Sequence, residues 1–227
     1  MNGLLGPYAL YTFLLRAAAV LLVIPFHEAA HALVSWRLGD PTAKNAGRLS
    51  LNPMRHFDWM GTLCMILGGV GWARPVGIDV RRFRNPKAGM AISAAAGPAA
   101  NLLLAYVCLL LYKLLYYGSH GAAAAVLLDF LSILISLNIS LAVFNLLPIP
   151  PFDGSRIFLL FLPQRLYFQA MRYERYIMIA VILLVFFNVL DGPLSFCING
   201  VLQFLCRVTG LPWEALVIGS QILDILG

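Results

Sequence analysis

The chain has 227 residues, of which 61% are hydrophobic and 11% are charged, and its mean hydropathy is +0.84. An ordinary soluble domain is about 45–50% apolar and about 25% charged, so this composition excludes a soluble domain and predicts an integral membrane protein. The formal net charge of +6 does not indicate nucleic-acid binding, because the basic residues lie in two loops between apolar segments, without a basic helix or binding motif elsewhere.

Four apolar segments predict about four transmembrane helices. In chain order they cover about residues 8–38, 89–117, 122–147 and 176–190. Residues 40–88, after the first segment, form a polar and partly amphipathic insertion. Within it, residues 48–52 and 76–80 alternate apolar and polar side chains, as strands do, and the apolar run 59–73 is too short to span a bilayer. We therefore expect a re-entrant or short-strand insertion at one membrane face.

From Pro193 the chain holds two shorter apolar stretches, separated by the sequence TGLP. They are expected to form interfacial helices or a helical hairpin. The predicted fold is thus an all-α polytopic membrane protein, with a membrane-embedded core over residues 1–192 and an apolar helical tail over residues 193–227.

Charge predicts the orientation of the segments. Arginine and lysine gather in the loop after the first segment and in the loop after the third, whereas only Lys113 lies near the loop between the second and third. Cytoplasmic loops carry the excess of basic residues, so both basic loops are predicted to be cytoplasmic and the N-terminus outside. The residues concerned are Arg37, Lys44, Arg48, Arg55, Arg74, Arg81, Arg82, Arg84 and Lys87, and then Arg156, Arg165, Arg172 and Arg175. We expect a multi-pass protein of the cell membrane.

The first apolar segment contains an HExxH pattern, His27-Glu28-Ala29-Ala30-His31. Residues four apart share one face of a helix, so both imidazoles can bind one Zn²⁺ while the adjacent glutamate reaches a water molecule. An acidic residue at the centre of a membrane helix costs about 2.5–3.5 kcal/mol on insertion scales, which favours a functional role for Glu28. The alternative is a structural Glu–His pair without a metal.

Asp153 is the candidate for a third protein ligand, which would leave a fourth position for water. It ends the stretch FNLLPIPPFD, where three prolines forbid a regular helix. Non-helical backbone at membrane depth is tolerated only where it is buried in protein or lines a wet cavity. The alternative is that Asp153 is the N-cap of the next helix. Of the other histidines, His120 lies on the opposite predicted side, and His56 is expected to be a loop or gating residue.

Together these motifs resemble the site-2 protease family of intramembrane zinc metalloproteases. The resemblance covers about residues 20–160, through HEAAH, GRLSLNPMRHFD, GWARPV, PKAGMAISAAAGPAANL and NLLPIPPFDG. It implies one zinc ion bound by His27, His31 and Asp153, with Glu28 acting in catalysis. The form is a compact one, since no loop is long enough for a PDZ domain and no tail could hold a nucleotide-sensing domain.

By the same resemblance, Asn101 and Asn145 belong to the surroundings of the active site. Asn145 could donate a hydrogen bond to a developing oxyanion, or it could bridge the backbone where the third segment breaks. Asn101 is expected to be a structural or substrate-positioning amide. The alternating residues 48–52 and 76–80 could add an edge strand to an unwound substrate, or could form a hairpin that only covers the site.

The sequence therefore predicts an intramembrane zinc endopeptidase that cleaves single-pass membrane proteins in or near their transmembrane segments, with the active site toward the cytoplasm. Expected partners are these substrates, the lipid bilayer, and a second copy or a regulatory membrane protein, but not nucleic acid. The alternative is a membrane zinc-binding or transport protein without peptidase activity. Transport would favour ionisable residues along a whole path, whereas here they cluster at one face, apart from Asp129. A catalytically silent scaffold is disfavoured because the ligands and the general base are all intact.

Overall fold

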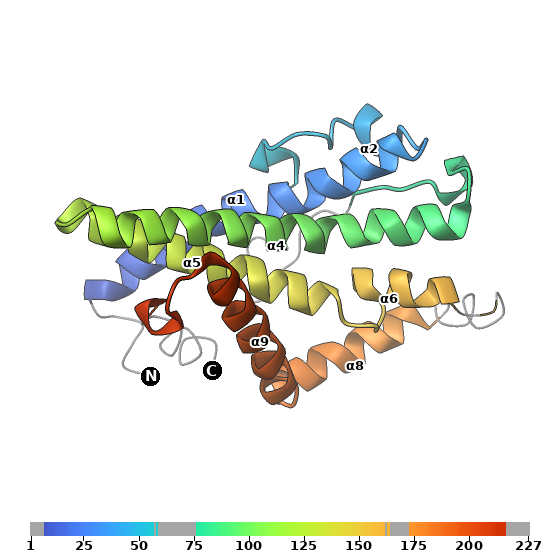
Figure 1. Ribbon diagram of the computed structural model, residues 1–227. Helices are drawn as coiled ribbons and strands as arrows, with labels where there is room; N and C mark the ends of the chain where they lie inside the picture. The colour runs from blue at the N-terminus through green and yellow to red at the C-terminus, as the bar shows by residue number, and fades with distance from the viewer. Residues whose placement is uncertain (1–6, 57, 59–75, 162, 164–172, 217–227) are drawn as a thin grey trace. The chain divides into compact units, whose positions relative to one another are not determined.

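The computed structural model describes residues 7–56, 58, 76–161, 163 and 173–216. All regular secondary structure in these residues is helical, and the helices can be followed by colour along the chain in Figure 1. The predicted all-α fold is therefore confirmed.

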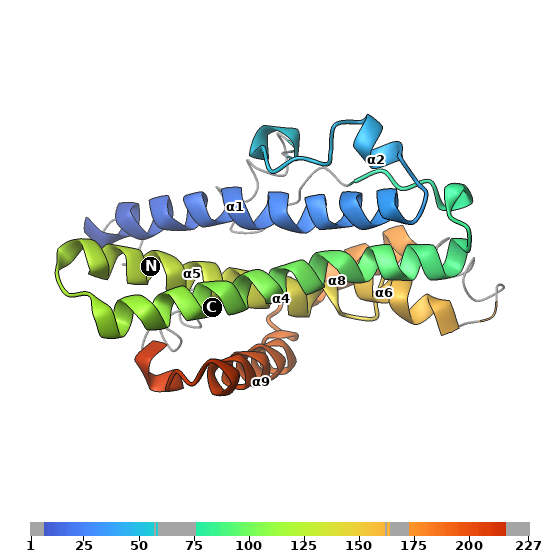
Figure 2. The ribbon, with the colours of Figure 1, turned by 45° about the horizontal axis from the view of Figure 1, so that its top comes forward.

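Three helices are long and apolar enough to cross a bilayer, namely α1 (Pro7–Arg37), α4 (Pro86–Gly118) and α5 (Ala122–Asn145). At about 1.5 Å per residue even α5, the shortest of them, is about 36 Å long, which exceeds the roughly 30 Å of a hydrocarbon core. Figure 2 shows the same three helices in a second view. The chain is thus a multi-pass membrane protein.

The fourth predicted segment is shorter than expected in the described residues. Helix α8 (Glu174–Phe186) has 13 residues and is followed by a turn in which Asn188 has a φ of 57°. A non-glycine residue at positive φ cannot continue a right-handed helix. At about 20 Å, α8 falls short of the hydrocarbon thickness, so the described residues contain three spanning helices where about four were predicted.

The described part of the tail, up to Leu216, is helical, as predicted. Helix α9 (Asp191–Thr209) ends at Gly210, whose φ of 66° lies in the left-handed region that glycine enters without strain. The main-chain N–H of Leu211 donates to the carbonyl of Cys206 over 3.0 Å and closes this cap. A short 3₁₀ turn, η4 (Trp213–Leu216), follows. The place of the tail in the membrane stays a prediction.

In its described residues, the insertion after α1 holds only short helical turns, α2 (Thr42–Asn45), η1 (Pro53–Arg55) and η2 (Val80–Arg82). The strands expected over residues 48–52 and 76–80 are absent from those residues. Side chains there bond the local backbone, which competes with a strand ladder. The Ser50 hydroxyl accepts from the N–H of Asn52, and the Asn52 amide oxygen accepts from the N–H of Met54. The expected re-entrant run 59–73 lies outside the described residues.

The chain forms two compact units, and each long helix contributes to both. The first comprises Met1–Val23, Asn101–Val143 and Leu184–Gly227. Its core is apolar, and three side chains add polar links within it. Tyr11 donates to Asp129 over 2.8 Å, Tyr112 donates to the carbonyl of Ala215 over 2.9 Å, and Lys113 donates to a main-chain carbonyl at the end of α9. Its buried core residues are Ala19, Val23, Ala105, Cys108, Leu109, Tyr112, Leu131, Leu134, Ile135, Ile139, Leu205, Cys206, Leu211 and Leu216.

The second unit comprises Ile24–Ala100 and Phe144–Leu183. A buried carboxylate, Asp40, links the end of α1 to the segment before α4. It accepts from the N–H and the hydroxyl of Thr42, over 3.0 and 2.5 Å, and from the N–H of Asp79 over 2.8 Å. The Ser35 and Ser93 hydroxyls, 2.6 Å apart, join α1 to α4 directly. This unit holds the cluster of side chains described next.

Candidate metal centre

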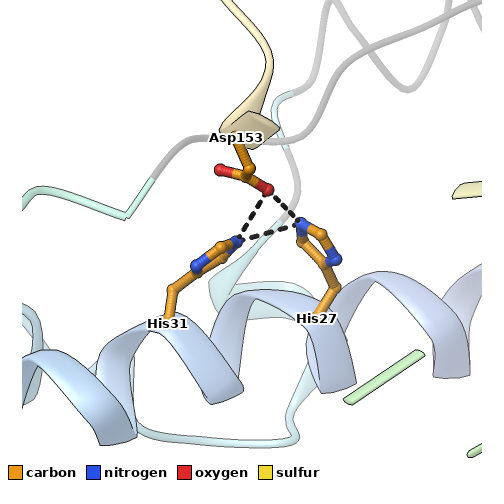
Figure 3. A group of neighbouring side chains, drawn as sticks. All are labelled: His27, His31 and Asp153. Atoms are coloured by element: carbon orange, nitrogen blue, oxygen red, sulfur yellow. Dashed lines mark hydrogen bonds and ion pairs between the residues drawn. The ribbon is translucent and has the colours of Figure 1, made fainter. Parts of the chain in front are cut away.

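Helix α1 presents two buried histidines one turn apart. His27 and His31 project from the same face, as Figure 3 shows, and their rings meet edge to face with centroids 4.6 Å apart. The two Nε2 atoms are 3.0 Å apart. The i, i+4 spacing predicted from sequence therefore brings two imidazole nitrogens to one point.

The break after α5 brings a carboxylate to the same point. Helix α5 ends at Asn145, and α6 (Asp153–Phe158) begins at Asp153 after a non-helical turn. The N-cap of α6 is Phe152, without a side-chain capping bond, so the alternative role of Asp153 as an N-cap is excluded. Its Oδ2 lies 3.3 Å from Nε2 of His27 and 3.2 Å from Nε2 of His31. Together with the contact between the two Nε2 atoms, these two contacts form the triangle drawn in Figure 3.

A glycine allows this placement of Asp153. A Cβ built on Gly154 would collide with main-chain atoms of Leu146 and would lie 2.6 Å from the carbonyl oxygen of Leu147. The first turn of α6 can therefore pack against the end of α5 only because residue 154 lacks a side chain. Farther along, Arg156 donates to Glu174 over 3.0 Å and ties α6 to α8.

The electrostatics of the triangle favour an anionic carboxylate. Burial alone would raise the pKa of Asp153, but the two imidazoles beside it lower this pKa to about 2. On the opposite side of His31, Nδ1 lies 2.7 Å from the main-chain carbonyl of Ser93. Because a carbonyl only accepts, His31 Nδ1 carries the proton, and the Nε2 of the neutral ring offers its lone pair to the triangle.

The three side chains fit a metal ion. Their ligand atoms all lie within 4.8 Å of one another, and they supply two nitrogens and one oxygen. Asp153 Oδ2 is buried without a hydrogen-bond partner among the described residues, and the Nε2 atoms of His27 and His31 lie beside it. Lone pairs of these atoms converging on one buried point repel each other unless a proton or a cation lies between them. Two imidazoles and a carboxylate, with a fourth position open, are a ligand set of catalytic zinc sites.

Glu28 follows His27 on α1 and is half-buried. Its carboxylate makes no hydrogen bond or ion pair with a described residue. Among the described residues, the Glu–His pair that was the alternative is therefore not formed by a hydrogen bond or an ion pair, although the charge of Glu28 acts on His31.

Comparison with known proteins shows which family the chain resembles. Peptidase family M50 matches residues 114–187, which include Asp153. The "Putative zinc metalloprotease YwhC" of Bacillus subtilis is 45% identical over 143 residues, which are 61% of this chain and 65% of that protein. The chain is thus similar to peptidase family M50, the site-2 protease family, over part of its length. A further relative is the "Putative zinc metalloprotease Rip2" of Mycolicibacterium smegmatis, which is 34% identical over 148 residues, 63% of this chain and 55% of that protein.

The chain spans less than two thirds of the length of these two relatives. No solved structure matches it.

The remaining residues implied by the family resemblance lie at different places. Asn145 is the last residue of α5 and is half-buried. Asn101, on α4, is fully buried, and both polar atoms of its amide lack a hydrogen-bond partner among the described residues. His56 is fully buried in the insertion, where its Nε2 lies 2.7 Å from the carbonyl of Ser50. It is not one of the three clustered side chains. The roles of these three residues stay predictions.

Sequence reasoning missed two features of α4 that act on the histidines. The main-chain carbonyl of Ser93 contacts His31, and the absence of a side chain at Gly97 leaves room for both rings. A Cβ on Gly97 would collide with Nε2 of His31 and lie 2.7 Å from Nε2 of His27. The signal available in the sequence was the Gly97-Pro98 pair within a helical apolar run, since both residues disfavour helix interiors.

Proposed function

We propose that this chain is an intramembrane zinc endopeptidase, with one zinc ion held by His27, His31 and Asp153. The observation that supports this most strongly is the buried triangle of Nε2, Nε2 and Oδ2 atoms, drawn from α1 and from the first residue of α6. An adjacent, unpartnered Glu28 and the relatives named as zinc metalloproteases support it further.

Zinc bound there would supply a Lewis acid that lowers the pKa of water and polarises a peptide carbonyl. The Glu28 carboxylate takes one proton from the attacking water, whose oxygen forms the new bond to the carbonyl carbon. Glu28 then delivers that proton to the amide nitrogen, which leaves as an amine when the C–N bond breaks. The carbonyl of Ser93 keeps His31 in the tautomer that binds metal. Asn145 is proposed as a donor to the oxyanion, and Asn101 as an amide that positions the substrate.

The proposed substrates are single-pass membrane proteins, cut in or near their transmembrane segments. A catalytic group placed within a membrane helix reaches only chains that enter the bilayer beside it, which excludes ordinary soluble substrates. The basic residues of the insertion and of the loop after α5 favour a cytoplasmic face for the site, in the cell membrane.

Glu28→Gln tests the mechanism. The amide keeps the size of the side chain but removes the base, so we expect bound zinc to remain and cleavage of co-expressed, tagged single-pass proteins to fall by at least 100-fold. Asp129→Asn is the matched control, because Asp129 is another acid in a long apolar helix and its carboxylate accepts from Tyr11 in the first unit. Cleavage by Glu28→Gln at the wild-type rate, with zinc bound, would refute the proposed role of Glu28.

A further inference from the structure

One turn of α4 lies against the two histidines. Ser93 and Gly97 are four residues apart and so share a face of α4. Both belong to the same compact unit as His27, His31 and Asp153. The turn contacts the His31 ring through the main-chain carbonyl of Ser93, and the absence of a side chain at Gly97 leaves room for both rings.

The Ser93 carbonyl determines which ring nitrogen of His31 carries the proton. It lies 2.7 Å from Nδ1, and the Ser93 hydroxyl is engaged elsewhere, with Ser35 at 2.6 Å and the carbonyl of His31 at 3.4 Å. Metal-binding histidines usually donate their other ring N–H to such an acceptor, which fixes the ring orientation. The bond therefore directs the free lone pair of His31 Nε2 toward the triangle.

Gly97 sets how close α4 comes to both rings. A Cβ at this position would collide with Nε2 of His31 and lie 2.7 Å from Nε2 of His27, whereas ordinary contact begins at 3.4 Å. Those are the two nitrogens of the triangle. Glycine in a helix interior costs about 0.5–1 kcal/mol relative to alanine, so helix formation does not favour glycine here. The close approach to the imidazoles explains it instead.

We propose that the Ser93–Gly97 turn of α4 positions the two histidines of the metal site. The main-chain carbonyl of Ser93 orients His31, and the absence of a side chain at residue 97 lets both metal-binding nitrogens keep their places. This inference rests on the proposed zinc site and adds two positioning residues to it. Any side chain at residue 97 must turn one or both rings away. The clash falls on side-chain atoms of the two rings and not on main chain, so the fold survives the substitution while metal affinity falls.

Gly97→Ala tests this, with Gly118→Ala as the matched control, because a Cβ on Gly118, in the same helix, meets nothing within 4 Å. The full chain is purified in detergent, stripped of metal, and titrated with zinc against a chelator of known affinity. Thermal unfolding is recorded with and without zinc. We expect Gly97→Ala to bind zinc about 10–100-fold more weakly than wild type, as loss of other orienting contacts does. Its unfolding temperature without metal should match that of the control, and its zinc-induced rise in unfolding temperature should shrink.

Ser93→Ala separates the carbonyl from the hydroxyl. It keeps the main-chain acceptor of His31 Nδ1 and removes the hydroxyl that bonds Ser35 and the carbonyl of His31. Its loss of zinc affinity should therefore be smaller than that of Gly97→Ala. An equal or larger loss in Ser93→Ala would contradict orientation by the carbonyl.

Wild-type zinc affinity in Gly97→Ala would overturn the positioning role while leaving the proposed zinc site intact. A Gly97→Ala chain that unfolds without metal would overturn it too, because Gly97 would then be a packing residue. Failure of the wild-type chain itself to bind zinc would overturn the proposed function and this inference together.

Discussion

Gly154→Ala should move the carboxylate of Asp153 out of the triangle. The added Cβ would lie 2.6 Å from the carbonyl oxygen of Leu147, and ordinary contacts begin at 3.4 Å, so a shift of about 0.8 Å is needed at this contact alone (3.4 − 2.6). The atoms in the way are main-chain atoms of Leu146 and Leu147, which cannot rotate aside. Metal–ligand distances are set to about ±0.2 Å, so a displacement of this size removes a ligand from its position.

Two magnitudes follow for this variant. Overpacking of a well-packed site costs about 1–3 kcal/mol, and in a chain of this size each kcal/mol lowers the unfolding temperature by about 2–4 °C. We therefore expect a decrease of about 2–12 °C in the absence of metal. Zinc affinity should fall by about 10–100-fold, because the ligand is displaced but not deleted.

The assay is thermal unfolding of the purified chain in detergent, together with zinc titration against a chelator. Gly200→Ala is the matched control, since a Cβ there meets nothing within 4 Å and the residue lies inside α9. The control should unfold at or slightly above the wild-type temperature, as alanine favours a helix. If Gly154→Ala unfolds and binds zinc like the control, the close approach of α6 to the end of α5 does not position Asp153, and the reasoning is refuted.

Two further substitutions test the links inside each unit by thermal unfolding. Asp40→Ala removes a buried carboxylate that accepts three hydrogen bonds, and we expect a loss of about 2–4 kcal/mol, whereas Asp40→Asn keeps one acceptor oxygen and should lose less. Equal stability of the alanine variant and wild type would contradict the proposed link. Tyr112→Phe should lose about 0.5–1.5 kcal/mol because the carbonyl of Ala215 loses its donor. Tyr116→Phe, which removes an exposed hydroxyl, is its control and should be neutral; similar losses in both would show that the hydrogen bond contributes nothing.

The long helices were predictable to within about three residues because hydrophobic length in a bilayer is a one-dimensional property of the sequence. The clustering of the proposed metal ligands was predictable for a different reason. Two histidines four apart share a helix face in any context, and a proline-rich break followed by an aspartate at membrane depth needs a buried or wet site. Tertiary structure then only had to bring His27, His31 and Asp153 together, which it does.

The features that sequence reasoning missed depend on contacts between distant segments. Alternation over residues 48–52 is typical of a strand, but Ser50 and Asn52 bond their own backbone instead. Gly97 matters because α4 comes so close to His31 that a side chain would not fit there. Nothing in a linear sequence gives the distance between two helices. The length of α8 depended on the left-handed backbone of Asn188, which the apolar run before it did not signal.

The zinc content of purified Asp153→Ala, measured by elemental analysis beside wild type and Asp129→Asn in the same detergent, tests the assigned ligand set most directly. Two imidazoles alone hold zinc weakly, because structural and catalytic sites have at least three protein ligands. We predict one zinc per chain in wild type and in Asp129→Asn, and a small fraction of that in Asp153→Ala. Full zinc occupancy in Asp153→Ala would contradict the assignment of Asp153 as a ligand.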